Sequence, residues 1–100
     1  MFIQVDHISR GMTASQTYTL NGGSRYSMLA LGDEGRITDI DLEVYDESGN
    51  LVGRDNDTMN IAKVTISAPD TGRYKFKVKA YSFKSGFSDG FYALVLYRID

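Results

Sequence analysis

The sequence contains no cysteine and only one histidine among its 100 residues. Without cysteine, the chain can form neither a disulfide nor a thiolate metal site. The single histidine, His7, leaves the commonest general base almost unused, and no G-x-S-x-G nucleophile motif or phosphate-binding glycine loop accompanies it. The sequence therefore predicts a protein that is not an enzyme, with His7 as a surface residue of an early strand.

Long apolar runs are also missing, since no stretch approaches the roughly 20 residues of a membrane-spanning helix. The formal net charge of −2 is too small to attract nucleic acid or an anionic bilayer, so we expect neither as a partner. The first ten residues lack the positive segment and apolar core of a signal peptide. We expect a secreted or periplasmic protein of which this chain is one part, or a cytoplasmic protein if Met1 is the natural start.

Short segments with apolar residues at alternate positions fill the chain, and glycine, asparagine and aspartate separate them, which is typical of an all-β fold. Apolar side chains alternate with acidic ones in residues 39–45 and with arginine and lysine in residues 73–80. Residues 9–15 are expected to form a turn-rich connection. About seven or eight such segments predict a single domain, residues 1–100, folded as an antiparallel β-sandwich or barrel.

Three motifs follow one another in a fixed order: DIDLEVYDESG at residues 39–49, APDTGRY at residues 68–74 and GFYAL at residues 90–94. Their order and spacing resemble the pattern of the bacterial pre-peptidase C-terminal domain family. The resemblance implies an eight-stranded, jelly-roll-like sandwich with a non-catalytic accessory role beside a secreted peptidase. The family includes the collagen-binding modules of clostridial collagenases, some of which bind calcium through acidic residues near the N-terminus of the domain. In this chain residues 1–15 contain a single carboxylate, Asp6.

An acidic set lies in the middle of the chain. Asp39 and Asp41 are two residues apart on a predicted strand, so both side chains project from the same face. Asp55, Asn56 and Asp57 form a turn that is expected near the end of that strand. Because Ca²⁺ takes about six to eight oxygen ligands from carboxylates, amides and carbonyls, these five residues predict a calcium site. The alternative is that they are ordinary turn and strand-edge residues.

Twelve aromatic residues, seven of them tyrosine, exceed what one core of this size must bury. Tyrosine suits a binding surface because it offers apolar area and a hydroxyl at low entropic cost. An exposed set would suit an extended protein chain or a polysaccharide; the alternative is a strand buried on both faces or a surface covered by a partner domain. The predicted ligand-binding residues are Tyr45, Tyr81, Phe83, Phe87 and Tyr97.

The alternate lysines Lys75, Lys77 and Lys79 are interpreted as a solvated face, which also prevents edge-to-edge aggregation. Together these features predict a non-catalytic binding or accessory module with calcium as its only expected cofactor. It would engage an extracellular protein or polysaccharide, or support an attached domain of its parent protein. The alternatives are a calcium-dependent C2-like or carbohydrate-binding domain and a self-associating subunit, that is, a homo-oligomer.

Overall fold

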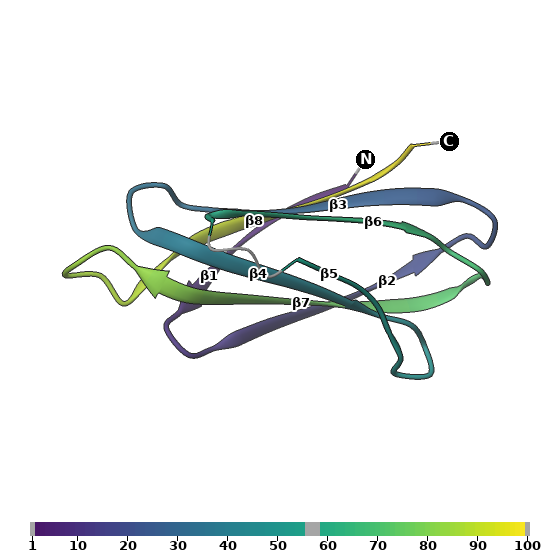
Figure 1. The fold of residues 1–100 in the computed structure, drawn as a ribbon, viewed down its shortest axis with the longest axis horizontal. Coiled ribbons are helices and arrows are strands. Elements are labelled where there is room, and N and C mark those ends of the chain that lie inside the picture. Colours follow the sequence, from purple (N-terminus) through teal and green to yellow (C-terminus); the bar gives the residue numbers. More distant parts are fainter. Residues whose placement is uncertain (1, 56–58, 100) are drawn as a thin grey trace.

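The computed structural model describes residues 2–55 and 59–99, which form eight β-strands in two four-stranded antiparallel sheets (Figure 1). Sheet A has the strand order β1-β8-β3-β6, and sheet B has the order β2-β7-β4-β5. This is the strand order of a jelly roll, and it confirms the predicted all-β sandwich. Within the described residues, no helix has the length and apolar character needed to cross a membrane. The strands are β1 (Phe2–Ser9), β2 (Thr13–Leu20), β3 (Arg25–Gly32), β4 (Ile37–Tyr45), β5 (Leu51–Asp55), β6 (Ile61–Ser67), β7 (Gly72–Phe83) and β8 (Asp89–Arg98).

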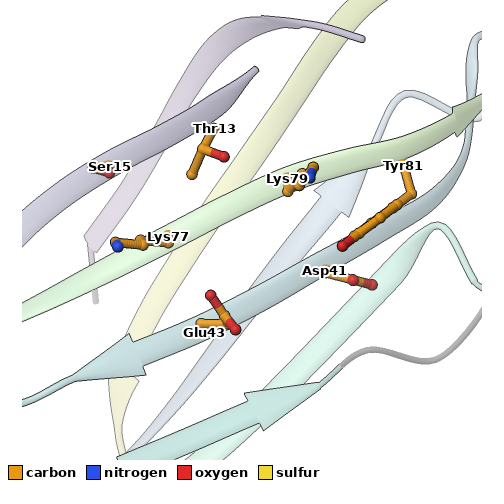
Figure 2. A pocket seen from close by; sticks show the side chains of 7 residues that line it. All are labelled: Thr13, Ser15, Asp41, Glu43, Lys77, Lys79 and Tyr81. Atoms are coloured by element: carbon orange, nitrogen blue, oxygen red, sulfur yellow. The ribbon is translucent and has the colours of Figure 1, made fainter. Parts of the chain in front are cut away.

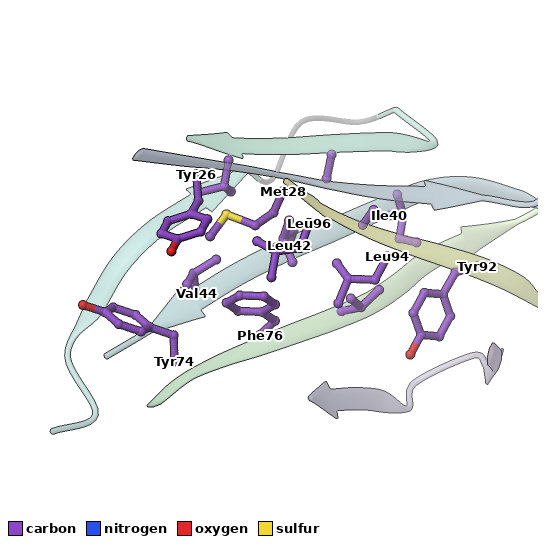
Figure 3. Close-up of a cluster of buried hydrophobic side chains, with 14 of the residues drawn as sticks. Tyr26, Met28, Ile40, Leu42, Val44, Tyr74, Phe76, Tyr92, Leu94 and Leu96 are labelled. Carbon is purple, nitrogen blue, oxygen red and sulfur yellow. The ribbon is translucent and has the colours of Figure 1, made fainter. Parts of the chain in front are cut away.

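Alternate side chains from both sheets fill the space between them (Figure 3). On β4, Ile40, Leu42 and Val44 are fully buried, while the acidic residues between them are only half-buried. The alternation predicted for residues 39–45 and 73–80 is therefore confirmed. Burying one such aliphatic side chain contributes about 1.5–3 kcal/mol, so this core is the main stabilising element of the fold. Besides Ile40, Leu42 and Val44, the largest buried side chains of the core are Leu20, Met28, Ile37, Phe76, Tyr92 and Leu94.

The connection predicted over residues 9–15 is shorter than expected. Strand β2 already begins at Thr13, and the turn before it contains Gly11 with a φ of +80°. The inward positions at this end of β2 are Ala14 and Gln16, which are small or polar. The strand therefore has little of the apolar alternation by which the other strands can be recognised.

The turn between β4 and β5 forms the predicted hairpin. Asp46 Oδ1 accepts a hydrogen bond from the backbone N–H of Asn50 at 2.8 Å, and Gly49 takes the left-handed conformation with a φ of +89°. The bond from the Asn50 backbone holds the pKa of Asp46 below its usual value. This hairpin fixes β5 against β4 and places Gly53 opposite Val44, on the inner side of the sheet.

The edges of the two sheets approach each other closely where β5 faces β6. A Cβ atom on Gly53 would lie 2.4 Å from Cγ1 of Val64 and 3.1 Å from Cγ2 of Ile66. Both neighbours are β-branched and have little freedom to rotate away. Asp55 Oδ2 accepts the backbone N–H of Lys63 at 2.8 Å, which links the same two strands. A side chain at position 53 therefore cannot fit unless Val64 or Ile66 moves.

We expect Gly53→Ala to destabilise the protein by about 1–3 kcal/mol, because the added methyl group overpacks a filled space. In a domain of this size each kcal/mol lowers the melting temperature by about 4–8 °C. Gly72→Ala is the matched control, since a Cβ there meets nothing nearer than 3.8 Å. Thermal melts followed by circular dichroism compare the two variants. Equal melting temperatures would show that the β5–β6 contact does not restrict the sandwich.

Candidate functional site: the outer face of sheet B

The outer face of sheet B is a polar surface formed by alternate residues of β2, β7 and β4. The antiparallel register aligns these residues in rows, so that Thr13 pairs with Lys79 and Lys79 pairs with Asp41. Residues that pair directly lie on the same face of a sheet, so this row presents a hydroxyl, an ammonium and a carboxylate side by side. The next row repeats this chemistry with Ser15, Lys77 and Glu43.

These two rows and Tyr81 line a hollow of about 400 Å³ (Figure 2). Tyr81 projects from β7 with 53% of its surface exposed, and its ring extends across the sheet toward Asp41 on β4. The hollow thus has a charged floor and one aromatic wall.

Each of the two lysines in the hollow lies against a tyrosine ring. Nζ of Lys77 is 4.8 Å from the ring centroid of Tyr45, and Nζ of Lys79 is 4.5 Å from the ring centroid of Tyr81. A cation held over an aromatic face gains about 0.5–1 kcal/mol at an exposed site, which orders the lysine side chains. Neither lysine forms an ion pair within the part of the chain that the structure describes. Their N–H donors therefore remain available to a ligand.

Tyr45 also fixes the carboxylate beside it. Its hydroxyl donates a hydrogen bond to Oε1 of Glu43 at 3.0 Å. This bond, together with burial and the negative charge of Glu43, raises the pKa of Tyr45, while the positive charge of Arg54 acts against the rise. The phenol therefore stays protonated at neutral pH and keeps the Glu43 carboxylate in place.

Three of the predicted calcium ligands lie close enough to influence one another. Burial raises the pKa of Asp39. Burial also raises the pKa of Asp41, and the negative charges of Asp39, Asp55 and Glu43 raise it further, while Lys79 lowers it. Oδ1 of Asp39 and Oδ1 of Asp41 are each buried without a hydrogen-bond partner. The ionised form of Asp41 therefore lowers the stability of the folded protein.

Within the described residues, Asp39, Asp41 and Asp55 do not by themselves form a cation site. Among residues 2–55 and 59–99, no group of three or more histidine, aspartate or glutamate side chains is arranged to hold a metal ion. Asp55 already uses Oδ2 to accept the backbone N–H of Lys63. The other two predicted ligands, Asn56 and Asp57, lie outside the described residues, so the calcium site stays a prediction.

The predicted aromatic surface is divided among several parts of the molecule. Tyr45 and Tyr81 lie on the outer face of sheet B, on either side of the lysines. Tyr97 is half-buried on sheet A. Phe87 lies in the loop between β7 and β8, where the guanidinium of Arg36 covers its ring at 4.7 Å. These residues do not form one continuous aromatic platform.

The expectation that Phe83 belongs to the exposed aromatic set is wrong. Phe83 is only 9% exposed and is part of the core, with the guanidinium of Arg10 lying 5.3 Å from its ring centroid. The pairing of β4 with β7 is irregular around Asp39. This irregularity reverses the alternation near the end of β7, so Phe83 turns inward although Tyr81, two residues earlier, points outward.

Several residues of the hollow were not predicted from the sequence as site residues. The Thr13 and Ser15 region was expected to be a turn, and the lysines were interpreted as a solvated face. A signal was available in the hydroxyl residues at alternate positions of β2, which pair with the basic residues of β7. The missed residues are Thr13, Ser15, Glu43, Lys77 and Lys79.

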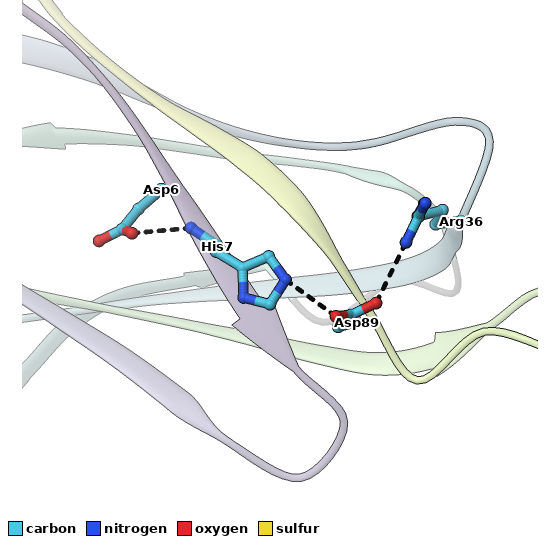
Figure 4. Close-up of polar contacts among 4 residues, drawn as sticks. All are labelled: Asp6, His7, Arg36 and Asp89. Atoms are coloured by element: carbon cyan, nitrogen blue, oxygen red, sulfur yellow. Dashed lines mark hydrogen bonds and ion pairs between the residues drawn. The ribbon is translucent and has the colours of Figure 1, made fainter.

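The only histidine belongs to a separate polar cluster (Figure 4). Nε2 of His7 lies 3.0 Å from Oδ2 of Asp89, whose Oδ1 accepts a hydrogen bond from Arg36 at 3.1 Å. The backbone N–H of His7 donates to Oδ1 of Asp6 at 2.7 Å. Within the described residues no hydroxyl bonds to the imidazole ring, so no nucleophile and base are paired there. His7 is an exposed residue of the first strand, as predicted.

The chain shares its fold with two solved proteins. It matches the pre-peptidase C-terminal domain of a collagenase from Bacillus anthracis with a TM-score of 0.75 and 18% identity, over 96% of this chain and 88% of that one. It matches PliG, a periplasmic inhibitor of g-type lysozyme from Aeromonas hydrophila, with a TM-score of 0.73 and 11% identity, over 98% and 85% of the two chains. A scan against family models and a search of the curated proteins found no match. At these identities the likeness establishes the fold alone, and it confirms the fold that the sequence resemblance implied.

We expect Asp41→Asn to raise the melting temperature at pH 7 by about 2–5 °C, because it removes a carboxylate whose charge is disfavoured by burial and by the acidic residues beside it. The pKa of Asp41 is higher in the folded than in the unfolded protein. The stability that protonated Asp41 contributes is fully present below the unfolded pKa of about 3.9. This contribution is lost as the pH rises through the pKa of Asp41 in the folded protein. The advantage of the variant should therefore disappear near pH 3.

Asp70→Asn provides the matched control, since Asp70 is an exposed residue in a loop. It should change the melting temperature by a few tenths of a degree at either pH. The same melts in EDTA and in millimolar calcium test the predicted cation site. A rise with calcium in the wild type that is absent in Asp41→Asn would show that a cation offsets the repulsion. A lower melting temperature of Asp41→Asn in EDTA would contradict the electrostatic account.

Proposed function

We propose that this chain is a non-catalytic binding module that holds an extended segment of a partner protein across the outer face of sheet B. The observation that carries the proposal is the hollow of about 400 Å³, in which Lys77 and Lys79 are ordered by tyrosine rings but have no ion partner among the described residues. Ordered and unpaired cations beside hydroxyls and carboxylates are suited to polar recognition.

The spacing of the side chains fits an extended polypeptide. Lys75, Lys77, Lys79 and Tyr81 project at every second position of β7, which is a repeat of roughly 6.6 Å. Same-side groups of an extended peptide recur with the same period. A peptide lying along β7 can therefore place successive side chains against successive members of this row.

The charge pattern favours a partner that carries both signs. The lysines of β7 are flanked on β4 by Asp41 and Glu43, so one ligand chain meets cationic and anionic groups within adjacent strands. Because the cation–π contacts already order the lysines, binding costs less side-chain entropy than it would for free lysines. A polysaccharide is less well matched, since the exposed aromatic residues do not form a planar row.

The roles of the two proteins with the same fold support this proposal. PliG is an inhibitor of a lysozyme, so in that protein the same fold serves recognition of another protein. The other neighbour is a domain of a collagenase. PliG is also periplasmic, and we place this chain outside the cytoplasm in the same way.

A displayed library of short random peptides tests the proposal, because it samples many extended segments at once. Selected peptides should bind the wild-type protein, and the double variant Lys77→Glu, Lys79→Glu should weaken them at least about tenfold, which corresponds to roughly 1.4 kcal/mol. Lys84→Glu is the matched control, because Lys84 is an exposed lysine in the loop after β7. Isothermal titration calorimetry measures each dissociation constant, and thermal melts verify the fold of each variant.

Two results would overturn the proposal. One is a library that yields no peptide binding below millimolar concentration, and the other is peptide binding that Lys84→Glu weakens as much as the double variant does. Heparin and oligosaccharides of chitin and cellulose serve as parallel probes. Binding of one of these in place of peptides, with loss in the double variant, would identify the same face as a carbohydrate site.

A further inference from the structure

The outer face of sheet A is apolar, in contrast to that of sheet B. Val5, Ala93, Leu31 and Ile61 pair in one row that crosses all four strands. Val5 and Ile61, on the two edge strands, are 63% and 47% exposed. In a monomer, these aliphatic side chains stay in water, so the row gains no free energy from burial.

The neighbouring rows continue the apolar surface. Ile3 is 57% exposed and pairs with Val95, which in turn pairs with Leu29. At the other side of the Val5 row, Phe91 is also 57% exposed and packs edge-on against the His7 ring at 5.4 Å. The surface therefore extends over three successive rows of the sheet.

Charged groups on this face lie at its border. Lys63 projects from the edge strand β6, Arg25 lies at one end of β3, and the His7–Asp89 pair lies at the opposite end of the sheet. Between Arg25 and the His7–Asp89 pair, none of the described outward positions of β3 and β8 carries a charge. An apolar centre with a polar rim is the usual anatomy of a protein–protein interface.

We propose that the outer face of sheet A joins two copies of this chain face to face in a symmetric dimer. Four strands about 4.8 Å apart and about eight residues long present roughly 500 Å² in projection. Two copies that meet over this area, polar rim included, cover about 1,000 Å² together, which is the lower limit for a specific interface, so we expect a weak dimer. The row from Val5 to Ile61 is apolar across all four strands, so the same row of a second copy offers it a matching surface. The net charge of −2 on each copy adds little repulsion.

Sedimentation equilibrium from micromolar to millimolar concentration tests the dimer. The wild type should reach a mass of twice the 11.2 kDa of one chain. Val5→Glu and Ile61→Glu should each raise the dimer dissociation constant at least tenfold, because a symmetric interface contains each substitution twice. Thr17→Glu is the matched control, since Thr17 is an exposed residue of an edge strand on the other sheet, and it should leave the constant unchanged.

The two glutamate variants separate face packing from edge pairing, because Val5 and Ile61 lie on opposite edges of sheet A. A dimer weakened by Val5→Glu and unaffected by Ile61→Glu would be formed through the edge of β1, which overturns the proposal. A wild type that remains monomeric at millimolar concentration also overturns it. In that case, co-sedimentation with phosphatidylcholine–phosphatidylglycerol vesicles that Val5→Glu abolishes would assign the face to a lipid surface. Thermal melts verify that both variants are folded.

Discussion

The burial of one face of each sheet against the other is the constraint on which the rest of the structure depends. Because side chains of a strand alternate between faces, the burial of Leu42 and Val44 leaves Asp41 and Glu43 on the outer surface. The antiparallel register then sets which residues of β7 lie beside them. A slip of one residue would exchange the buried and exposed sets, so the apolar core and the polar hollow are consequences of the same register.

The two outer faces are chemically unlike, although the two inner faces are similar. The outer face of sheet B mixes lysines, carboxylates and hydroxyls, whereas the outer face of sheet A has one row of aliphatic residues that runs from edge to edge. Folding requires only the inner faces to be apolar, so the stability of the sandwich does not explain either outer pattern. A polar face can remain in water, whereas an apolar face gains free energy only when another surface covers it.

Much of the fold could be predicted from alternation alone, because a half-buried strand must alternate, as residues 39–45 do. Alternation failed for Phe83, since the irregular pairing around Asp39 is a property of two strands and cannot be seen in one. It failed for the start of β2 because the inward residues there are small or polar. The hollow was missed for a related reason: Asp41 and Lys79 become neighbours only through the register of β4 with β7. The sequence motifs indicated the fold but contain no information on these neighbours.

The positions of the two faces also decide what a dimer could do. If sheet A joins two copies, the outer faces of both B sheets point in opposite directions. With sheets stacked about 10 Å apart, a four-layer assembly separates these faces by roughly 30 Å. One short peptide cannot span both faces, so each would bind its own segment, and the two binding events would be linked only when both segments belong to one long polymer or one surface. Dimerisation would therefore increase avidity for repetitive or clustered partners and leave the affinity for a single soluble segment unchanged.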